Sequence, residues 1–387
     1  MAFRPSQHNR TISVGLAAIL LVTVASFLGR NAAAASTTRS RREMMQQTNA
    51  QSSDAWLLQM LAGMRSPLSK AESDRFAELY KKTGSVGDLC EAGKLYCDAK
   101  SFNLYYQNLL QFDGKKQEKD ISVFFRETEL VVGREISIED PRLQSAALEK
   151  NRLQLAEFDT PSGSVGMSKY NYLNVAKMPE RSFLPAELAQ TLPFSSDSAV
   201  KVFQLDPSSI LAQESAKTFQ ICQEGIHKDG TTELNGEAAA CATSLEALQS
   251  LVRSPMLLGP HDAANVKALS TDERLHSGSS FRGKVVEVSL EASVEQRHAV
   301  CHNLMYPSAV YFCHYLPRTR VYSVMLQPLD AAGAQQRHLV RAIAMCHMDT
   351  TGWNPRHLAF QNLLTLPGHG EACHWVLQGS MTFVPTA

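Results

Sequence analysis

Four Cys-His dipeptides fall between residues 301 and 374 of this 387-residue chain. Eight cysteines and twelve histidines placed at random would give about a quarter of one such dipeptide, so chance explains four poorly. Ten, thirty-one and twenty-five residues separate successive dipeptides. Cysteine and histidine are both metal ligands, and both also serve structure through disulfides and hydrogen bonds. The dipeptides are Cys301-His302, Cys313-His314, Cys346-His347 and Cys373-His374.

The adjacency of Cys and His argues against a zinc finger, whose ligands are roughly two to five residues apart. Neighbouring residues on a strand point to opposite faces, so one dipeptide cannot easily aim both side chains at one ion. We expect the four cysteines to form two disulfides and the four histidines to converge on the other face. Imidazoles without thiolate in a secreted protein suit copper(II) better than zinc. The alternative is that these histidines are ordinary strand residues beside structural disulfides. The candidate metal ligands are His302, His314, His347 and His374.

The first 35 residues predict a secretory signal peptide. Arg4 and Arg10 precede an uncharged apolar stretch, Ile12–Gly29, and small residues follow at 31–36. An uncleaved signal anchor is the alternative. Secretion predicts that the cysteines form disulfides, with connectivity left open by the sequence. The expected disulfide cysteines are Cys90, Cys97, Cys222, Cys241, Cys301, Cys313, Cys346 and Cys373.

The overall charge gives no sign of a polyanionic partner. Lys plus Arg and Asp plus Glu each number 38, so the formal net charge is zero. We therefore expect no nucleic-acid partner and, after signal cleavage, no membrane association. Hydrophobic residues make up 44% of the chain, which is enough for a sizeable core. The sequence carries no phosphate-binding loop after a strand and no His-Glu-x-x-His motif.

The N-terminal region at 36–120 is predicted to be polar and partly helical. The apolar spacing predicts a helix over Ser66–Tyr80, with Ser66 as its cap and Pro67 at its first position. Cys90 and Cys97 are close enough in sequence for a short-range disulfide. The charged segment Gly114–Asp120 is the expected linker to the second block.

The second block, 121–387, predicts an α+β fold in which the C-terminal part is mainly antiparallel β. Helices are expected after Phe183-Leu184-Pro185 and over Ser208–Gln223 and Ser244–Val252, and Cys222 and Cys241 lie in this helical part. Short segments rich in β-branched and aromatic residues predict the strands. These segments are Ile121–Phe125, Val285–Leu290, Ala309–Phe312, Val321–Leu326 and Leu339–Met345.

The spacing of the dipeptides resembles the signature of the plant BURP-domain family. Neighbouring motifs agree, among them Met348-Asp349-Thr350, Trp353–His357 and Cys241–Glu246. The resemblance runs from about Ile121 to Val384. The chain departs from the family by an insertion at Ala331–Leu339 and by Phe383 where a tryptophan is usual.

This resemblance implies an extracellular protein of the cell wall or apoplast, non-catalytic and connected with development or stress. The segment around Ser66-Pro67-Leu68 and the Cys90–Cys97 pair are similar to the start of the non-catalytic beta subunit of polygalacturonase 1. The Phe-x-x-Tyr-Gly repeats of that subgroup are absent from the sequence. The implied partner is a wall enzyme or a wall polysaccharide.

A second interpretation is enzymatic, because some BURP proteins resemble copper-dependent cyclases that cross-link Trp or Tyr side chains of a core peptide. The four Cys-His histidines would then bind copper. Candidate cross-linked residues are Trp56, Tyr96, Tyr105 and Tyr106, with core packing as the alternative. Asp349 and His357 would either orient the ligand histidines or be structural.

Overall fold

A computed structural model of the chain describes residues 61–100, 124–138, 180–224, 238–262, 266–272, 281–315, 317–329, 338–353, 355, 357–376 and 379–386. The chain divides into two units, Met1–Ala55 and Trp56–Ala387. The predicted signal peptide, the predicted linker Gly114–Asp120 and residues 331–337 of the predicted insertion lie outside the described residues.

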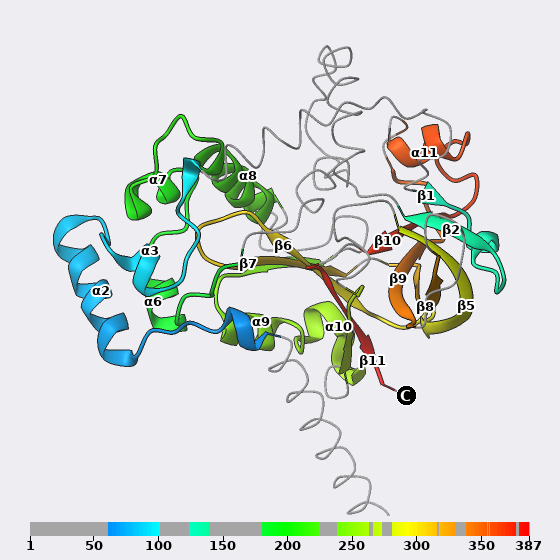
Figure 1. The fold of residues 1–387 in the computed structure, drawn as a ribbon, viewed down its shortest axis with the longest axis horizontal. Coiled ribbons are helices and arrows are strands. Elements are labelled where there is room, and N and C mark those ends of the chain that lie inside the picture. Colours follow the sequence, from blue (N-terminus) through cyan, green and yellow to red (C-terminus); the bar gives the residue numbers. More distant parts are fainter. Residues whose placement is uncertain are drawn as a thin grey trace, which may run out of the picture. The chain divides into compact units, whose positions relative to one another are not determined.

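The first sheet is antiparallel and has the strand order β1-β10-β9-β8-β5-β2 (Figure 1). Strands β9 and β10, which carry the third and fourth Cys-His dipeptides, are hydrogen-bonded neighbours. The strands are β1 Phe124–Phe125, β2 Glu135–Ile138, β5 Phe281–Ala292, β8 Thr319–Pro328, β9 Val340–His347 and β10 Ala372–Val376.

The second sheet is also antiparallel and has the order β3-β7-β6-β11-β4. Strands β6 and β7 carry the first two dipeptides and are neighbours in turn. The strands are β3 Ala238–Ala242, β4 Val266–Leu269, β6 Ala299–Leu304, β7 Val310–Tyr315 and β11 Met381–Pro385.

Hydrophobic side chains from both sheets meet in one buried cluster. Val300 and Val384 come from the second sheet, and Met345 comes from the first. Because side chains alternate along a strand, His302 lies on the same face of β6 as Val300. His347 lies on the same face of β9 as Met345 for the same reason. The histidines of the dipeptides therefore belong to the faces that the two sheets turn toward each other.

Most of the helices lie at one end of the described body, where α2, α6, α7 and α8 gather beside one another (Figure 1). The helix α10 contains a kink at Gly259, whose φ of 79° suits a residue without a Cβ atom. The helices are η1 Ala62–Met64, α2 Lys70–Thr83, α3 Leu89–Ala92, η2 Glu127–Glu129, α6 Ala186–Thr191, α7 Ser198–Phe203, α8 Ile210–Glu224, α9 Leu245–Leu251, α10 Pro255–Asp262 and α11 Leu358–Asn362.

The N-terminal helices share a core with the helices that follow residue 180. Phe76 of α2 and Leu89 of α3 are fully buried in one cluster with Leu188 of α6. The backbone N–H of Val86 donates to the carbonyl of Val202 at 3.2 Å, which fixes the two segments to each other. Residues 61–100 are therefore part of the same packed body as the C-terminal sheets.

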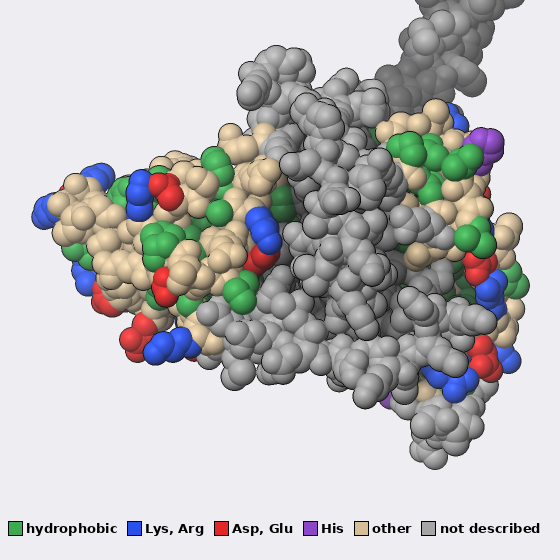
Figure 2. All heavy atoms as spheres, turned by 90° about the horizontal axis from the view of Figure 1, so that it is seen from above, with side chains coloured by type: hydrophobic (Ala, Val, Ile, Leu, Met, Phe, Trp, Pro, Cys, Tyr) green, Lys and Arg blue, Asp and Glu red, His purple; other side chains and the backbone are tan. Residues whose placement is uncertain are grey.

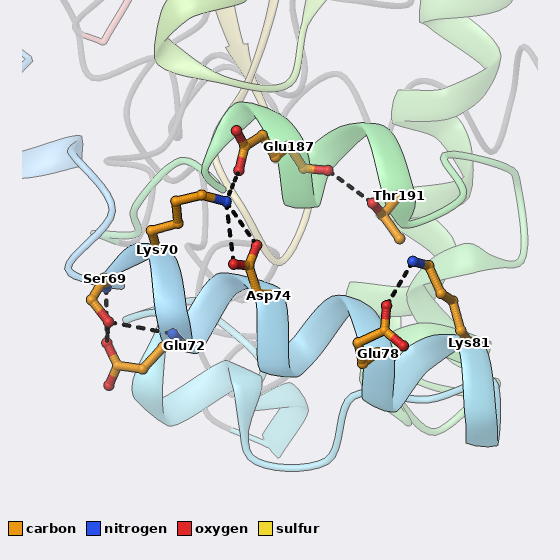
Figure 3. Close-up of polar contacts among 8 residues, drawn as sticks. All are labelled: Ser69, Lys70, Glu72, Asp74, Glu78, Lys81, Glu187 and Thr191. Atoms are coloured by element: carbon orange, nitrogen blue, oxygen red, sulfur yellow. Dashed lines mark hydrogen bonds and ion pairs between the residues drawn. The ribbon is translucent and has the colours of Figure 1, made fainter.

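Helix α2 begins later than the sequence-based prediction, because Ser69 rather than Ser66 caps it. The Ser69 hydroxyl accepts from the backbone N–H of Glu72 at 3.3 Å, and the Glu72 carboxylate accepts from the backbone N–H of Ser69 at 2.8 Å (Figure 3). This reciprocal arrangement satisfies two donors at the start of the helix. Lys70 then pairs with Asp74 and with Glu187 of α6, both at 3.1 Å, on the exposed side.

The predicted α+β class with a mainly antiparallel C-terminal part is confirmed. The predicted helices at 208–223 and 244–252 correspond to α8 and α9. Cys241 corrects the prediction in one respect, because it lies in strand β3 and not in a helical segment. Charged side chains of both signs are intermingled on the described part of the face in Figure 2. Of the helices that the structure describes, none has the length and apolar character needed to cross a bilayer.

Candidate functional site

Each sheet carries one disulfide between directly opposed cysteines of two Cys-His dipeptides. Cys301 faces Cys313 across β6 and β7, and Cys346 faces Cys373 across β10 and β9, with Cα–Cα distances of 3.9 Å in both pairs. All four side chains are fully buried. The predicted disulfides are thus present. The cysteines occupy the outer face of each sheet, and each disulfide fixes the register in which the adjacent histidines stand.

The four histidines form two contact pairs, one from each sheet. The Nε2 atoms of His302 and His314 are 3.1 Å apart, and those of His347 and His374 are 3.2 Å apart. Within each pair the residues are diagonal neighbours, since His302 lies opposite Phe312 and not opposite His314. His314 and His347 are buried, and the other two are partly buried. At these distances one neutral imidazole donates its N–H to the other.

The partners of the Nδ1 atoms define the protonation of the second pair. Nδ1 of His374 is 3.2 Å from the carbonyl oxygen of Trp375, which can only accept, so Nδ1 of His374 carries the proton. Its Nε2 is therefore a bare acceptor, and Nε2 of His347 donates to it. Nδ1 of His347 in turn accepts from the hydroxyl of Thr319 at 3.1 Å. That hydroxyl also has a second acceptor, the carbonyl of Pro317, at 3.2 Å.

Burial and mutual repulsion keep these imidazoles neutral. Burial, with a smaller contribution from the charge of His374, lowers the pKa of His302 to about 4. Burial also holds the pKa of His314 and of His347 well below the ordinary value, and the neighbouring histidines add to this effect. His374 contributes to the pKa of a histidine in each sheet, so the two pairs lie within electrostatic range of each other.

Two further buried histidines, His298 and His357, belong to the same neighbourhood. The pKa of each is lowered to about 4, chiefly by burial. The Nε2 atom of each is buried and has no hydrogen-bond partner among the described residues. Charges on both lower the pKa of His347. His298 was not among the residues predicted from the sequence; it lies just before strand β6, four residues ahead of His302.

The indole of Trp353 covers this part of the site. Its ring centroid is 4.9 Å from that of His347 and 4.6 Å from that of His357. Phe124 of β1 also contacts His357 and His374 edge-on. These aromatic rings exclude water from the imidazole pair, which explains the lowered pKa values in physical terms.

The residues expected to orient the histidines have other partners. Asp349 accepts from the backbone and the hydroxyl of Thr351 and pairs with Arg318 at 3.4 Å. His357 caps helix α11, because its Nδ1 accepts from the backbone N–H of Ala359 at 3.1 Å. Tyr96 packs against the core that α2 and α3 share with α6. The candidates Trp56, Tyr105 and Tyr106 lie outside the described residues.

The four histidines have the chemistry of a metal site but are not gathered around a single point. Two nitrogens bound at a right angle to one ion are about 2.9 Å apart when each bond is about 2.0–2.1 Å. Each Nε2 pair is close to that separation, so each fits two adjacent ligand positions. Within the described part of the chain, no group of three or more His, Cys, Asp or Glu side chains is placed to hold one ion. One ion bound by all four histidines would have to draw the two pairs together.

The remaining disulfides hold the helical part of the body. Cys90 is bonded to Cys97, as the sequence spacing suggested, and Cys222 is bonded to Cys241. The second of these joins α8 to the edge strand β3. All eight cysteines are therefore used in disulfides.

Comparison with known proteins shows which proteins this chain is similar to. Residues 162–385 match the family model of the BURP domain. BURP domain-containing protein 14 of Oryza sativa subsp. japonica is 32% identical over 208 residues, which is 54% of this chain and 28% of that protein. Polygalacturonase non-catalytic subunit AroGP3 of Solanum lycopersicum is 32% identical over 212 residues, or 54% of this chain and 30% of the subunit. BURP domain protein RD22 of Arabidopsis thaliana is 32% identical over 198 residues, or 50% and 46%. The chain thus spans less than half the length of each of these relatives.

Proposed function

We propose, because the chain belongs to the plant BURP-domain family, that it is a secreted, non-catalytic accessory protein of the cell wall or apoplast. The observation that carries the proposal is the similarity to AroGP3, a protein named as a non-catalytic subunit of polygalacturonase. The partner would be a wall enzyme of that class or the polysaccharide on which it acts. A role in wall development or stress response follows from the same relationship.

The architecture supports a binding role outside the cell. Four disulfides link cysteines that are 7 to 27 residues apart in sequence, and such cross-links persist in oxidising compartments. The N-terminal helices, which resemble the start of the polygalacturonase subunit, pack into the body of the domain through Phe76 and Leu89. A partner would therefore meet one continuous surface built from both regions.

The test is association with a polygalacturonase. A chain without residues 1–35, produced in a secretory host, is mixed with a plant polygalacturonase and separately with homogalacturonan. We expect co-elution with the enzyme and a change in its heat stability. The control is the same chain with its four disulfides reduced and alkylated. Binding to the polysaccharide alone would assign the role to the wall matrix. Failure to bind either one would contradict the proposal.

The two imidazole pairs favour a second candidate function, a copper-dependent peptide cyclase. Buried, neutral imidazoles suit copper(II), and lowered pKa values leave the nitrogen lone pairs available near neutral pH. The ligands would be His302, His314, His347 and His374. Bound copper would supply the redox chemistry for joining an aromatic side chain to another group, a two-electron oxidation that releases two hydrogens and for which dioxygen would be the final oxidant. The chain's own residues would hold the ion and exclude water, the latter through Trp353 and Phe124.

The second pair is built to change its protonation when a metal binds. If Nε2 of His347 were a metal ligand, the ring proton of His347 would have to be on Nδ1, which would then be the donor. The Thr319 hydroxyl can then accept from Nδ1 and donate to the Pro317 carbonyl, which lies at 3.2 Å. Rotation of one hydroxyl group therefore serves both states.

Copper(II) titration of the metal-stripped chain tests this candidate. We expect one strong site that is lost in His347→Ala and in His302→Ala. The exposed His338 provides the control His338→Ala, which should leave the affinity unchanged. Intact-mass measurement of the copper-loaded chain, alone and with a Tyr- or Trp-containing peptide, would show the loss of two hydrogens on cross-linking. If the chain bound copper(II) no more tightly than an exposed histidine such as His338 does, the proposal of a copper-dependent cyclase would be wrong.

A further inference from the structure

We propose that the loop of residues 363–369, which follows helix α11, is the surface through which the chain docks on an uncharged apolar patch of its wall-enzyme partner. The inference rests on the first proposed function, association with a wall enzyme or a wall polysaccharide. It assigns the enzyme, and not the polysaccharide, to this loop.

The loop exposes two leucine side chains to solvent. Leu364 is 93% exposed and Leu366 is 62% exposed, and Leu364 has the highest exposed fraction of the large hydrophobic side chains in the described residues. The sequence has no Asp, Glu, Lys or Arg between Arg356 and Glu371, so both leucines stand in an uncharged segment. Hydrophobic side chains that are exposed together on one short segment are typical of a site of protein–protein contact.

The backbone at Leu364 does not favour leucine. Helix α11 ends in a turn in which the backbone N–H of Thr365 donates to the carbonyl oxygen of Phe360 at 3.0 Å. Leu364 lies within this turn in the left-handed conformation, with a φ of 49°. Glycine or asparagine usually occupies this position, because a larger side chain crowds the backbone there. Leucine strains the turn and gains nothing from burial, so a contact outside the chain explains it better than the fold does.

The loop is held in shape before any partner binds. The Thr365 hydroxyl donates to the carbonyl oxygen of His369 at 2.9 Å, and the backbone N–H of Gly368 donates to the hydroxyl of Thr350 at 3.0 Å. Leu363 packs inward against a buried hydrophobic cluster. A preformed loop loses little conformational freedom on docking, which favours affinity.

The charge of the loop separates the two partners that the proposed function allows. Homogalacturonan carries a carboxylate on every sugar, and proteins bind such anions through Lys and Arg. The loop contains neither residue type. Arg126 reaches the segment just after the loop, but its guanidinium donates to the carbonyl oxygen of Glu371, whose own side chain is acidic. Leu364 and Leu366 instead match an uncharged apolar patch on a protein, since apolar contact forms the core of such interfaces.

The test measures the affinity of a plant polygalacturonase for the chain without residues 1–35 and for its variant Leu364→Asn/Leu366→Asn. Asparagine tolerates the left-handed conformation, so the variant should unfold at a temperature no lower than that of the unsubstituted chain. We expect the dissociation constant for the enzyme to rise by about tenfold or more, since a few side chains at the centre of an interface carry most of the binding energy. The affinity for homogalacturonan should not change.

The matched control makes the same substitutions at another pair of exposed apolar side chains. Val131 and Val132 are 53% and 61% exposed and lie in the loop that precedes β2. The variant Val131→Asn/Val132→Asn should bind the enzyme as tightly as the unsubstituted chain does.

The outcomes separate the inference from the function on which it rests. If the unsubstituted chain does not bind the enzyme, both are wrong. Equal binding by the leucine variant and the unsubstituted chain overturns only the role of the loop, and so does a loss of binding confined to the valine variant. Light scattering on the chain alone tests a different occupant. If the leucine substitutions convert a dimer into a monomer, the loop binds a second copy of the chain, and the proposed docking of the enzyme there is wrong.

Discussion

Thr319 is the residue whose hydroxyl group can hold His347 in either protonation state. It is fully buried, and its Oγ1 lies between Nδ1 of His347 and the Pro317 carbonyl. We expect Thr319→Val, which keeps the shape and removes the hydroxyl, to weaken copper(II) binding by about 10–100-fold. Thr319→Ser should retain most of the affinity. Isothermal titration of the stripped chain with copper(II) measures both.

Thr382 provides the matched control for this substitution. It is also a fully buried threonine in a sheet, but its Oγ1 has no hydrogen-bond partner in the described part of the chain. Thr382→Val removes an unsatisfied hydroxyl and should leave stability unchanged or raise it by about 1 kcal/mol. Copper affinity should not change. Equal losses of affinity in the two valine variants would show that buried packing, and not the hydroxyl on His347, controls binding.

His357 makes the metal-free protein sensitive to acid. Burial lowers the pKa of His357 to about 4, so between about pH 6.5 and 4 the unfolded chain binds a proton that the folded chain does not. The free energy of unfolding therefore falls as the pH falls through this range. His357→Asn keeps an N-capping side chain on α11 and removes this proton. Relative to the variant, the unsubstituted chain should lose roughly 3 kcal/mol between pH 7.5 and 3.5. Urea unfolding at several pH values measures the difference, and parallel profiles would contradict it.

At the scale of single elements, local patterns predicted the strands that contain β-branched and aromatic residues, such as β8 and β9. They also placed the cysteine and the histidine of each dipeptide on opposite faces, because alternation is a property of any strand. Strand β3 was missed, since Ala238–Ala242 has weak strand propensity and is extended because it pairs with β7. The division of the histidines into two pairs could not be predicted, because it depends on which strands become neighbours. The orphaned nitrogen of His298 depends on tertiary packing for the same reason.

Helix α2 allows a direct test of which of two serines caps it. The sequence contains two serines, Ser66 and Ser69, that could cap the helix, and the reciprocal contacts with Glu72 select Ser69. We expect Ser69→Ala to lower the free energy of unfolding by about 1 kcal/mol. Ser66→Ala should cost much less, because the Ser66 hydroxyl accepts a long hydrogen bond, 3.4 Å, from the amide of Leu68, which lies before the helix. Thermal unfolding followed by circular dichroism compares the stability of the two variants. A larger loss of stability in Ser66→Ala than in Ser69→Ala would show that Ser66, the cap predicted from the sequence, is the one that matters.

At the scale of the whole described body, the N-terminal helices and the family domain cannot be treated as separate modules. The family match begins at residue 162, and the charged segment before residue 121 suggested a linker. Yet Phe76, Val86 and Leu89 are fully buried against residues that follow position 180. Composition reports where a chain is polar, but it does not report which apolar surfaces will meet. The boundary of the folded unit therefore had to come from the packing.

This shared core predicts how shortened chains behave. A chain that begins at Trp56 retains every described helix. It should unfold in a single transition, at the same unfolding temperature as the chain that lacks only residues 1–35. A chain that begins at Ile121 leaves the apolar surface of α6 to α8 uncovered and should aggregate or unfold at a much lower temperature. Phe76→Ala, which makes a cavity in the same core, should lower the free energy of unfolding by about 3–5 kcal/mol. Lys70→Ala removes only exposed ion pairs and should lower the free energy of unfolding by less than about 1 kcal/mol. Calorimetry distinguishes these cases. If the chain that begins at Ile121 unfolded reversibly at the same temperature as the chain without residues 1–35, the N-terminal helices would be an independent attachment to the domain and not part of its core.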